Sequence, residues 1–179
     1  MSHHPQAAKR VEHVFDLFDI DGNGFIEATD VELMTNRVVA AATGSDEAAK
    51  DAIRAAFGRY WSTMATELDQ NADGRISLDE FRPFVLSPER FGPAVEQFAE
   101  ALSALGDPDG DGLVERPVFE ALMKAIGFVH ENLHALFDAF GPTAEDRVEA
   151  EVWRAAIVEF YEPDNAETHG NHLVPGYAA

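Results

Sequence analysis

Residues 69–80 read DQNADGRISLDE, and this stretch sets oxygen atoms at regular intervals around a tight bend. Gly74 at the sixth place permits the bend, because glycine adopts backbone conformations that other residues avoid. The oxygen donors stand at places 1, 3, 5, 7, 9 and 12: Asp69, Asn71, Asp73, the Arg75 backbone carbonyl, Ser77 and Glu80. Such a set can surround a hard cation with roughly six to eight oxygens. The segment is therefore predicted to bind a doubly charged hard ion.

The same twelve-residue spacing recurs three more times along the chain. Residues 19–30, 107–118 and 141–152 read DIDGNGFIEATD, DPDGDGLVERPV and GPTAEDRVEAEV. We number the four segments loops 1 to 4 in chain order, so that DQNADGRISLDE is loop 2. Their eighth places hold β-branched residues, and apolar residues at helical spacing flank each loop. We expect four helix–loop–helix units, with Ile26 pairing with Ile76 and Val114 with Val148 in short two-stranded ladders.

Loop 2 matches the EF-hand calcium pattern in full, and loop 1 matches it except at the last place. The predicted ligands of loop 1 are Asp19, Asp21, Asn23, the Phe25 carbonyl and Asp30. The pattern has glutamate at place 12, and aspartate is one methylene shorter. Binding through one oxygen of Asp30 suits the six-fold geometry of magnesium better than glutamate does. We expect calcium in loops 1 and 2, with magnesium competing in loop 1.

Loops 3 and 4 depart further from the pattern. Loop 3 opens well, with Asp107, Asp109 and Asp111 at places 1, 3 and 5. Val118 at place 12 cannot ligate an ion, and Glu115 at place 9 compensates only in part. We therefore predict a weak third site. Loop 4 has Asp146 where the bend wants glycine and a valine at place 12, which predicts a structural role without calcium.

The flanking helices define the domain organisation. The long interval between loops 1 and 2 predicts two long helices that join near residues 42–46, with Ser45 as the N-cap of the second. Ser87 and Pro88 open the helix before loop 3, unless it starts at Pro93. The whole is predicted to be an all-α fold of four EF-hand units in two packed pairs, residues 1–86 and residues 87–162.

Residues 163–179 form a C-terminal tail with an apolar cluster near its end. This cluster comprises Leu173, Val174, Pro175 and Tyr177. The cluster could fold back over the core and fill a groove, or the tail could fray as chain ends often do. The sequence leaves these two alternatives open.

Composition narrows the class of protein. The chain has no cysteine, which excludes disulfides and thiolate metal sites and suits a reducing cytoplasm. Its net charge of −20 repels phosphate backbones and argues against nucleic-acid partners. Neither a secretory signal nor about 18 consecutive apolar residues occur, so no membrane segment is expected. We expect a monomeric cytoplasmic protein, and arginine usage over lysine suggests a bacterial source.

Residues 130–134 read HENLH, which is the zinc signature of many metalloproteases. His130 and His134 would share one helix face, as a zinc ligand pair does. The repeat, however, already accounts for the segment as the helix that enters loop 4, with Leu133 and Phe137 at core positions. Downstream carboxylates such as Glu151 lack any accompanying motif. A zinc hydrolase is kept as a remote alternative, and we expect a protein that is not an enzyme.

Four such units in an acidic, cysteine-free chain with a long first interval resemble the sarcoplasmic calcium-binding proteins and their bacterial relative calerythrin. The resemblance covers roughly residues 8–162 and implies two compact pairs of hands that bind calcium without catalysis. Light-emitting photoproteins share that architecture and hold a chromophore in the interior. Trp61, Tyr60 and His13 would be candidates for such a pocket, although aromatic residues at helical spacing usually form core.

Two roles follow from the resemblance and the composition. In the first, the protein buffers or transports calcium and stays closed. In the second, calcium opens a groove that binds a target helix of a partner protein. Sensors of that kind rely on clustered methionines for adaptable contacts. The chain has only four methionines, which do not cluster, so we favour the buffer and keep the sensor as the alternative.

Overall fold

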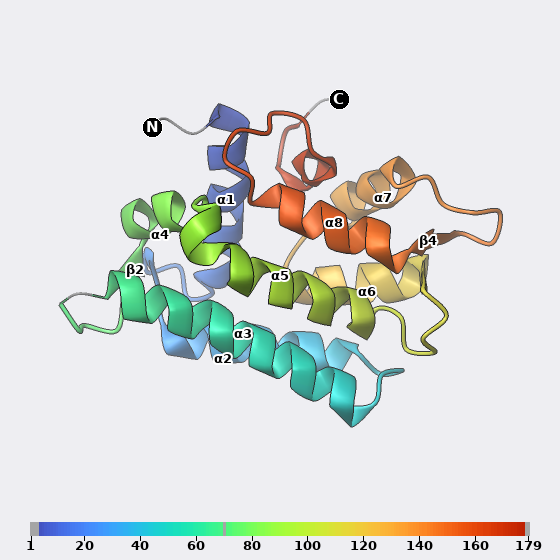
Figure 1. Cartoon of the computed structure of the whole chain (residues 1–179), viewed down its shortest axis with the longest axis horizontal. Helices are drawn as coiled ribbons and strands as arrows, with labels where there is room; N and C mark the ends of the chain where they lie inside the picture. The colour runs from blue at the N-terminus through green and yellow to red at the C-terminus, as the bar shows by residue number, and fades with distance from the viewer. Residues whose placement is uncertain (1–3, 70, 178–179) are drawn as a thin grey trace.

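The computed structural model describes residues 4–69 and 71–177, and these residues form four helix–loop–helix units (Figure 1). The remaining residues are 1–3 in the predicted first pair, 70 in loop 2, and 178–179 in the predicted tail. The helices around loops 1 and 2 are α1 Pro5–Phe18, α2 Ala28–Ala41, α3 Glu47–Leu68 and α4 Leu78–Val85. Those around loops 3 and 4 are α5 Pro88–Leu105, α6 Arg116–Ile126, α7 His130–Ala139 and α8 Ala150–Phe160.

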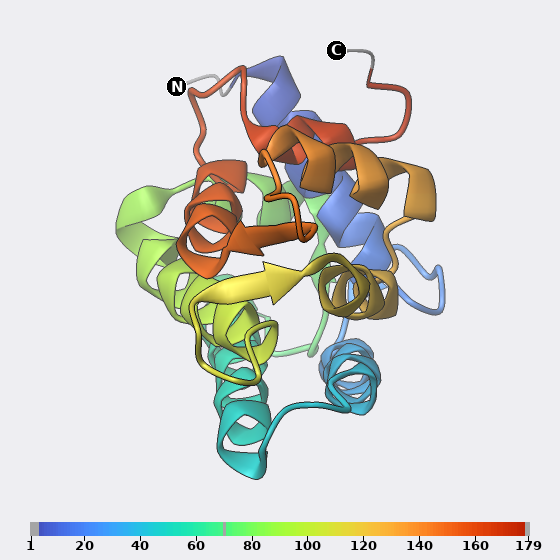
Figure 2. The same ribbon diagram turned by 90° about the vertical axis from the view of Figure 1, so that its right-hand side faces the viewer.

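Two short antiparallel pairings join the loops two by two. The strands are β1 Phe25–Ile26, β2 Ile76–Ser77, β3 Leu113–Glu115 and β4 Arg147–Glu149. In the register, Ile26 stands opposite Ile76 and Val114 opposite Val148, which confirms the predicted pairings. Figure 2 shows β3 and β4 side by side. The β-branched eighth places therefore couple loop 1 to loop 2 and loop 3 to loop 4.

The helix starts follow local sequence signals, with two corrections. Ser87 is the N-cap of α5 and Pro88 its first residue, as predicted, whereas the alternative start at Pro93 is wrong because the helix continues through it. The predicted N-cap of α3, Ser45, is also wrong. Asp46 is the N-cap, and its Oδ1 accepts the Ala49 N–H at 2.9 Å. The Ser45 hydroxyl instead donates to the Leu105 carbonyl at 2.9 Å.

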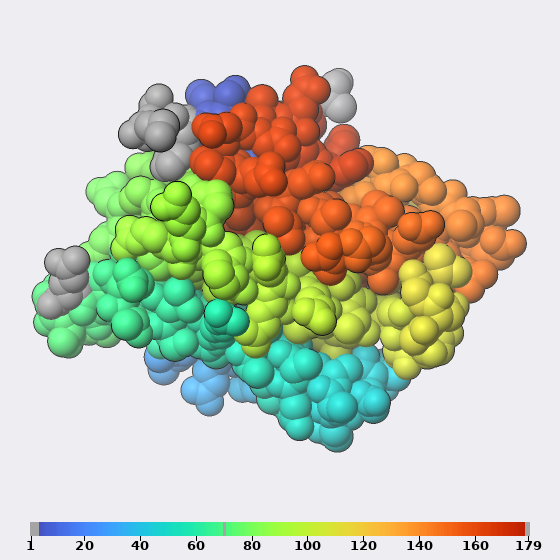
Figure 3. Space-filling model, in the orientation of Figure 1, coloured from blue at the N-terminus to red at the C-terminus, as the bar shows by residue number. Residues whose placement is uncertain are grey.

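The two pairs of units share one core. Helix α3 packs on α5, α5 on α8 and α2 on α6, and Figure 3 shows α3, α5 and α8 side by side across one face. Aromatic rings link the pairs: the Tyr60 and Phe91 centroids lie 4.8 Å apart, and those of Phe57 and Phe98 lie 5.1 Å apart. Leu86, at the boundary between the predicted pairs, is buried. Each pair therefore positions the loops of the other through packed helices.

The tail folds back over the core, which confirms the first of the two alternatives. Its 3₁₀ helix, η1 His169–Leu173, contacts α7, α8 and α1, and Leu173 is only 4% exposed. The buried Arg10 of α1 donates from Nε to the Phe160 carbonyl at 2.8 Å and from Nη1 to Asn171 Oδ1 at 3.0 Å. Burial lowers the pKa of Arg10 to about 10, although the charge of Glu162 opposes this shift. This guanidinium therefore binds the first helix to the last segment.

In the residues that the structure describes, no helix is both long enough and apolar enough to cross a bilayer.

Candidate metal-binding loops

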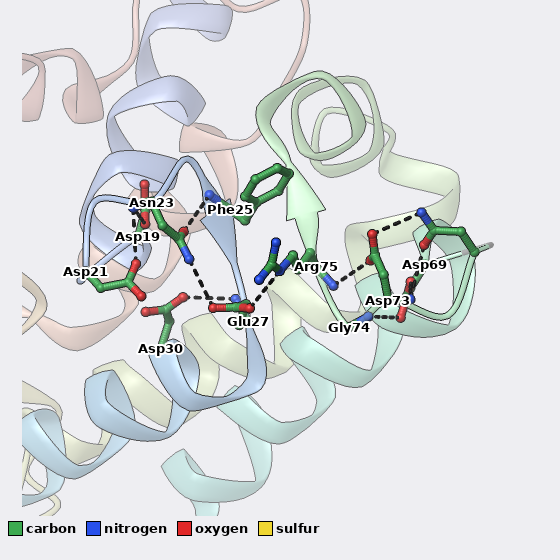
Figure 4. Close-up of polar contacts among 11 residues, drawn as sticks. Asp19, Asp21, Asn23, Phe25, Glu27, Asp30, Asp69, Asp73, Gly74 and Arg75 are labelled. Atoms are coloured by element: carbon green, nitrogen blue, oxygen red, sulfur yellow. Dashed lines mark hydrogen bonds and ion pairs between the residues drawn. The ribbon is translucent and has the colours of Figure 1, made fainter.

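Loop 1 gathers three carboxylates around its bend. One oxygen each from Asp19, Asp21 and Asp30 lies within 4.8 Å of the others (Figure 4). Asp19 accepts the Asn23 N–H at 3.0 Å through Oδ1 and the Gly24 N–H at 2.8 Å through Oδ2. Gly24 has φ +86°, a conformation that favours glycine. The backbone thus wraps around the first aspartate of the loop and brings the three acids together.

Asp30 is the deeply placed member of this group. It is 2% exposed, and its Oδ2 accepts the Glu27 N–H at 3.0 Å, so the start of α2 fixes its orientation. Burial raises the pKa of Asp30, the Glu27 hydrogen bond opposes this shift, and the neighbouring acids add to it. A carboxylate held in this way presents its other oxygen to the centre of the loop. A divalent ion there would offset the repulsion among the three acids.

Loop 2 adopts the same bend with its own residues. Asp69 accepts the N–H groups of Asp73 and Gly74, both at 2.9 Å. The Asn71 amide donates to Asp73 Oδ2 at 3.0 Å, and the Arg75 N–H lowers the pKa of Asp73. At place 12, Glu80 Oε2 accepts the Ser77 N–H at 2.9 Å. The equivalent bond holds Asp30 in loop 1, so places 9 and 12 are locked together in both loops.

A cross-loop contact links loops 1 and 2 in addition to the strands. The Arg75 side chain donates from Nε to Glu27 Oε1 at 3.1 Å (Figure 4). The Arg75 backbone N–H donates to Asp73, and the Phe25 N–H donates to Asn23 Oδ1 at 3.0 Å. Sequence reasoning assigned only backbone carbonyls to places 7. The Arg75 side chain therefore also links the two loops, because its charge pairs with Glu27 of loop 1.

Loop 3 gathers its acids in the same manner. One oxygen each from Asp107, Asp109 and Asp111 lies within 4.8 Å of the others, and Asp107 accepts the Gly112 N–H at 2.8 Å. Burial raises the pKa of Asp107, whereas the Asp111 N–H lowers the pKa of Asp109. Asp109, Asp111 and Glu115 line one hollow of about 250 Å³. The loop thus keeps the bend and its first three acids.

Two features of loop 3 weaken it as an ion site. Val118, at place 12, lines the hollow without an oxygen and packs partly against the core. Arg147 of loop 4 places Nη1 3.5 Å from Asp111 Oδ2. A guanidinium beside the third acid supplies positive charge where an ion would bind, so the two compete.

Loop 4 is held by an arginine that sequence reasoning missed. Arg116 donates from Nε to Asp146 Oδ2 at 2.7 Å and from Nη2 to Asp138 Oδ1 at 2.6 Å. Its guanidinium also lies 4.4 Å from the Phe137 ring centroid. The hydrogen bond to Asp146 raises the pKa of Arg116 and lowers that of Asp146. Asp146 takes φ +60° at the place that glycine holds in the other loops.

The HENLH segment forms the first part of α7, as the repeat predicted. Leu133 and Phe137 are fully buried, and the His130 and His134 side chains are about half exposed. The structure places Glu120 of α6 beside these histidines. Glu151, considered as a downstream carboxylate, instead accepts from Arg154 Nε at 2.8 Å. The interpretation of α7 as a helix with buried apolar residues and outward histidines is confirmed.

The core contains a small apolar cavity of about 70 Å³. Tyr60 and Tyr161 line it and hydrogen-bond each other through their hydroxyls at 3.1 Å, and burial raises the pKa of Tyr161 to about 12. Trp61 and His13 do not line it, so the three candidate pocket residues do not come together. The cavity is less than half the size of one of roughly 150 Å³ that holds benzene. It therefore has no room for a chromophore.

Comparison with known proteins identifies the family. A model for the EF-hand domain pair matches residues 8–86, which contain loops 1 and 2. Residues 8–86 are an EF-hand domain pair. The whole chain is 23% identical to calerythrin from Saccharopolyspora erythraea over 163 residues, which cover 87% of the chain and 92% of calerythrin. It is 29% identical to sarcoplasmic calcium-binding protein 1 from Astacus leptodactylus over 76% of each chain. The resemblance inferred from sequence is confirmed.

The fold of the chain is also similar to solved structures. One is described as the structural basis for prokaryotic calcium-mediated regulation by a Streptomyces coelicolor calcium-binding protein. It superposes with a TM-score of 0.69 at 22% identity and covers 89% of this chain and 99% of that one. None of the comparisons supports a zinc hydrolase. The match to the EF-hand domain-pair model ends at residue 86, before loops 3 and 4.

Proposed function

We propose that the chain is a calcium buffer of four EF-hands in which loops 1 and 2 each bind one calcium ion without catalysis. The observation that carries this proposal is the shared hydrogen-bond pattern of these two loops. In both, the first aspartate accepts the N–H groups of places 5 and 6, and the acid at place 12 accepts the N–H of place 9. The oxygens are therefore oriented before an ion arrives, which reduces the ordering cost of binding.

The ligands of the two sites are those that the spacing predicts. Site 1 would use Asp19, Asp21, Asn23, the Phe25 carbonyl and Asp30; site 2 would use Asp69, Asn71, Asp73, the Arg75 carbonyl and Glu80. Site 1 is the one at which magnesium competes, because Asp30 is short and fixed by the Glu27 N–H. One carboxylate oxygen in place of two lowers the coordination number toward six.

Loops 3 and 4 are proposed as EF-hands with reduced or lost ion binding. Loop 3 keeps its three aspartates but lacks an acid at place 12, and the Arg147 guanidinium approaches Asp111. Loop 4 has Arg116 bound to Asp138 and Asp146, so a permanent positive charge stabilises its bend. Any calcium in loop 3 is weak, and loop 4 takes none.

A closed buffer fits the apolar surfaces better than an opening sensor does. The methionines at 34, 64 and 123 are all buried, so they offer no adaptable exposed surface. The tail covers the core through Leu173 and through the hydrogen bonds of Arg10. Among the described residues, the exposed large hydrophobic side chains are Leu33 and Val129. In the part of the chain that the structure describes, these two side chains are too few for the contiguous apolar patch that would bind a target helix.

Calorimetric titration of chelator-stripped protein with calcium, repeated in the presence of magnesium, tests the proposal. Two tight ions are expected for the wild type. Glu80→Gln should remove one of them, because the shell of loop 2 then cannot close with two charged oxygens. Asp107→Ala is the matched control and should change little. Absence of tight calcium binding in the wild type would overturn the proposal. A large loss of calcium binding in Asp107→Ala would show that loop 3 is not the weak site that we propose.

The buffer role is tested separately with a dye that fluoresces on apolar surfaces. A buffer should leave the fluorescence flat or lower it when calcium is added. A sensor would raise it, because an apolar groove would open. A rise in fluorescence would therefore replace the buffer with the sensor and leave the calcium sites untouched.

A further inference from the structure

A cluster of possible metal ligands lies between α6 and α7, apart from the acids of the four loops. It consists of Glu120, His130 and His134, each offering a ligand atom within 4.8 Å of the others. Glu120 Oε2 lies 3.7 Å from His130 Nδ1, and Glu120 Oε1 lies 3.8 Å from His134 Nδ1. The two histidines stand one turn apart on α7, so both face the same side of that helix.

Core packing fixes the two helices that carry this cluster. Phe119, next to Glu120, packs on Phe137 with the ring centroids 5.2 Å apart, and both rings are fully buried. Gly127, with φ +123°, follows α6 and permits the short turn into α7. Glu120 therefore faces the histidines because of the tertiary fold rather than through flexible surface side chains. The site is built on rigid elements, which is what a metal centre needs.

The environment of Glu120 points to a cation. Its side chain is 15% exposed, and its Oε1 is buried and accepts no hydrogen bond within the described residues. A buried carboxylate oxygen without a donor is unfavourable, because it has lost water without gaining a partner. The histidines opposite are 56% and 54% exposed, so a metal ion can approach from solvent on their side.

The donor atoms fit one class of metal. Two imidazole nitrogens and one carboxylate oxygen form a ligand set that zinc uses, leaving a fourth position for water. In a tetrahedral site with bonds of about 2.1 Å the ligand atoms lie about 3.4 Å apart. The distances of 3.7 and 3.8 Å run to different oxygens of Glu120, and single ligand atoms of all three residues lie within 4.8 Å of one another. Side-chain rotation must therefore shorten these separations to close a tetrahedral site. Calcium and magnesium prefer oxygen ligands throughout, so they do not compete well here.

Two charged neighbours surround His134. Arg116 places Nη1 3.1 Å from its Nδ1, and Asp138 places Oδ2 3.6 Å from its Nε2. A metal on Nδ1 would displace that contact of Arg116, which keeps its hydrogen bonds to Asp138 and Asp146. Asp138 then stands where a carboxylate accepts the outer N–H of a metal-bound imidazole and orients it. The guanidinium lowers the affinity of the site without blocking it.

We propose that Glu120, His130 and His134 form a binding site for a divalent transition-metal ion of the zinc class, independent of the calcium loops. The proposal includes no hydrolysis. In the protease pattern the glutamate within HENLH would act as the base, but here Glu131 is exposed and the carboxylate at the cluster is Glu120. The HENLH histidines thus act with an acid from another helix. The proposal does not depend on calcium binding by the loops.

The test uses the full chain, stripped with chelator and then saturated with calcium. Titration with Zn²⁺ by calorimetry should give one bound ion per chain that excess calcium does not displace. Co²⁺ should give the visible absorption of a tetrahedral nitrogen–oxygen site. Glu120→Gln and His134→Gln should each weaken Zn²⁺ binding by more than about tenfold. Both variants should keep the calcium stoichiometry of the wild type, which shows that they are folded.

Matched controls are Glu131→Gln in the same helix and His172→Gln in the tail, and both should bind Zn²⁺ like the wild type. Several results would overturn the proposal. Zn²⁺ binding unaffected by Glu120→Gln and His134→Gln would place the ion elsewhere. Displacement of Zn²⁺ by calcium would place it in the loops. Absence of Zn²⁺ binding would remove the site altogether.

Discussion

We propose that single residues at place 12 of the loops set which ion each loop prefers. Asp30 and Glu80 hold the same place and accept the same kind of hydrogen bond, from Glu27 N–H and Ser77 N–H. They differ by one methylene group, and the shorter acid is 2% exposed. Val118 at this place in loop 3 offers no oxygen at all. The chemistry of the loops therefore changes stepwise through one position.

Asp30→Glu should raise the preference of loop 1 for calcium over magnesium, because the longer acid can supply two oxygens. Calorimetric titration with calcium, in the presence and absence of magnesium, measures the change. The magnesium-dependent loss of calcium affinity should shrink by about tenfold or more, and loop 2 should keep its affinity as the internal control. An unchanged magnesium effect would mean that Asp30 does not limit the coordination number.

At the scale of elements, capping decides where each helix begins. Two candidate caps stand next to each other before α3, and propensity does not separate serine from aspartate. Asp46 caps the helix, while the Ser45 hydroxyl donates to the Leu105 carbonyl at the end of α5. The choice depends on a contact 60 residues away in the chain. The local signal therefore located the helix start only to within one residue.

Asp46→Ala should lower the free energy of unfolding by about 1 kcal/mol, because the Ala49 N–H loses its cap acceptor. Urea unfolding followed by circular dichroism measures the difference. Asp51→Ala is the matched control: it removes an exposed aspartate of the same helix that pairs only with Arg54, and it should cost less than about 0.5 kcal/mol. Equal effects of the two substitutions would show that the cap contributes nothing beyond surface charge.

At the scale of the whole molecule, the tail packs on the helices that surround the shared core. Arg10 donates to the Phe160 and Glu162 carbonyls and to Asn171. A single guanidinium therefore joins the first helix to the last residue of α8 and to two residues that follow it. Figure 1 shows α1 and the tail on the same side of the molecule. The buffer role that we propose rests on this packing of the tail.

Arg10→Met should destabilise the protein by about 3 kcal/mol, because three acceptors lose a charged donor while the volume of the side chain is roughly kept. Urea unfolding gives the free energy. Fluorescence of the apolar-surface dye should rise at the same time as the tail loosens. Arg54→Met, an exposed arginine on α3, is the control and should change neither quantity appreciably. Native stability in Arg10→Met would mean that other contacts hold the tail.

The sequence by itself determined the loops and their pairing. The predicted ligands of a loop lie within twelve residues, so spacing alone predicts the oxygen set, and the β-branched eighth places predicted the register of both ladders. Helical periodicity also predicted the helices that flank each loop. It predicted α7 as the helix that enters loop 4 rather than as the zinc-binding helix of a protease. These features depend on local backbone geometry, which short sequence patterns encode directly.

Only the tertiary structure decided which distant charges meet. Arg116 reaches Asp146, Glu120 faces His134, and Arg10 binds Asn171 of the tail, across 30, 14 and 161 residues of chain. The sequence alone did not indicate which residue each of these side chains contacts. Their contacts depend on how helices pack around a shared core, and packing is set by the summed shape of many apolar side chains rather than by any short pattern.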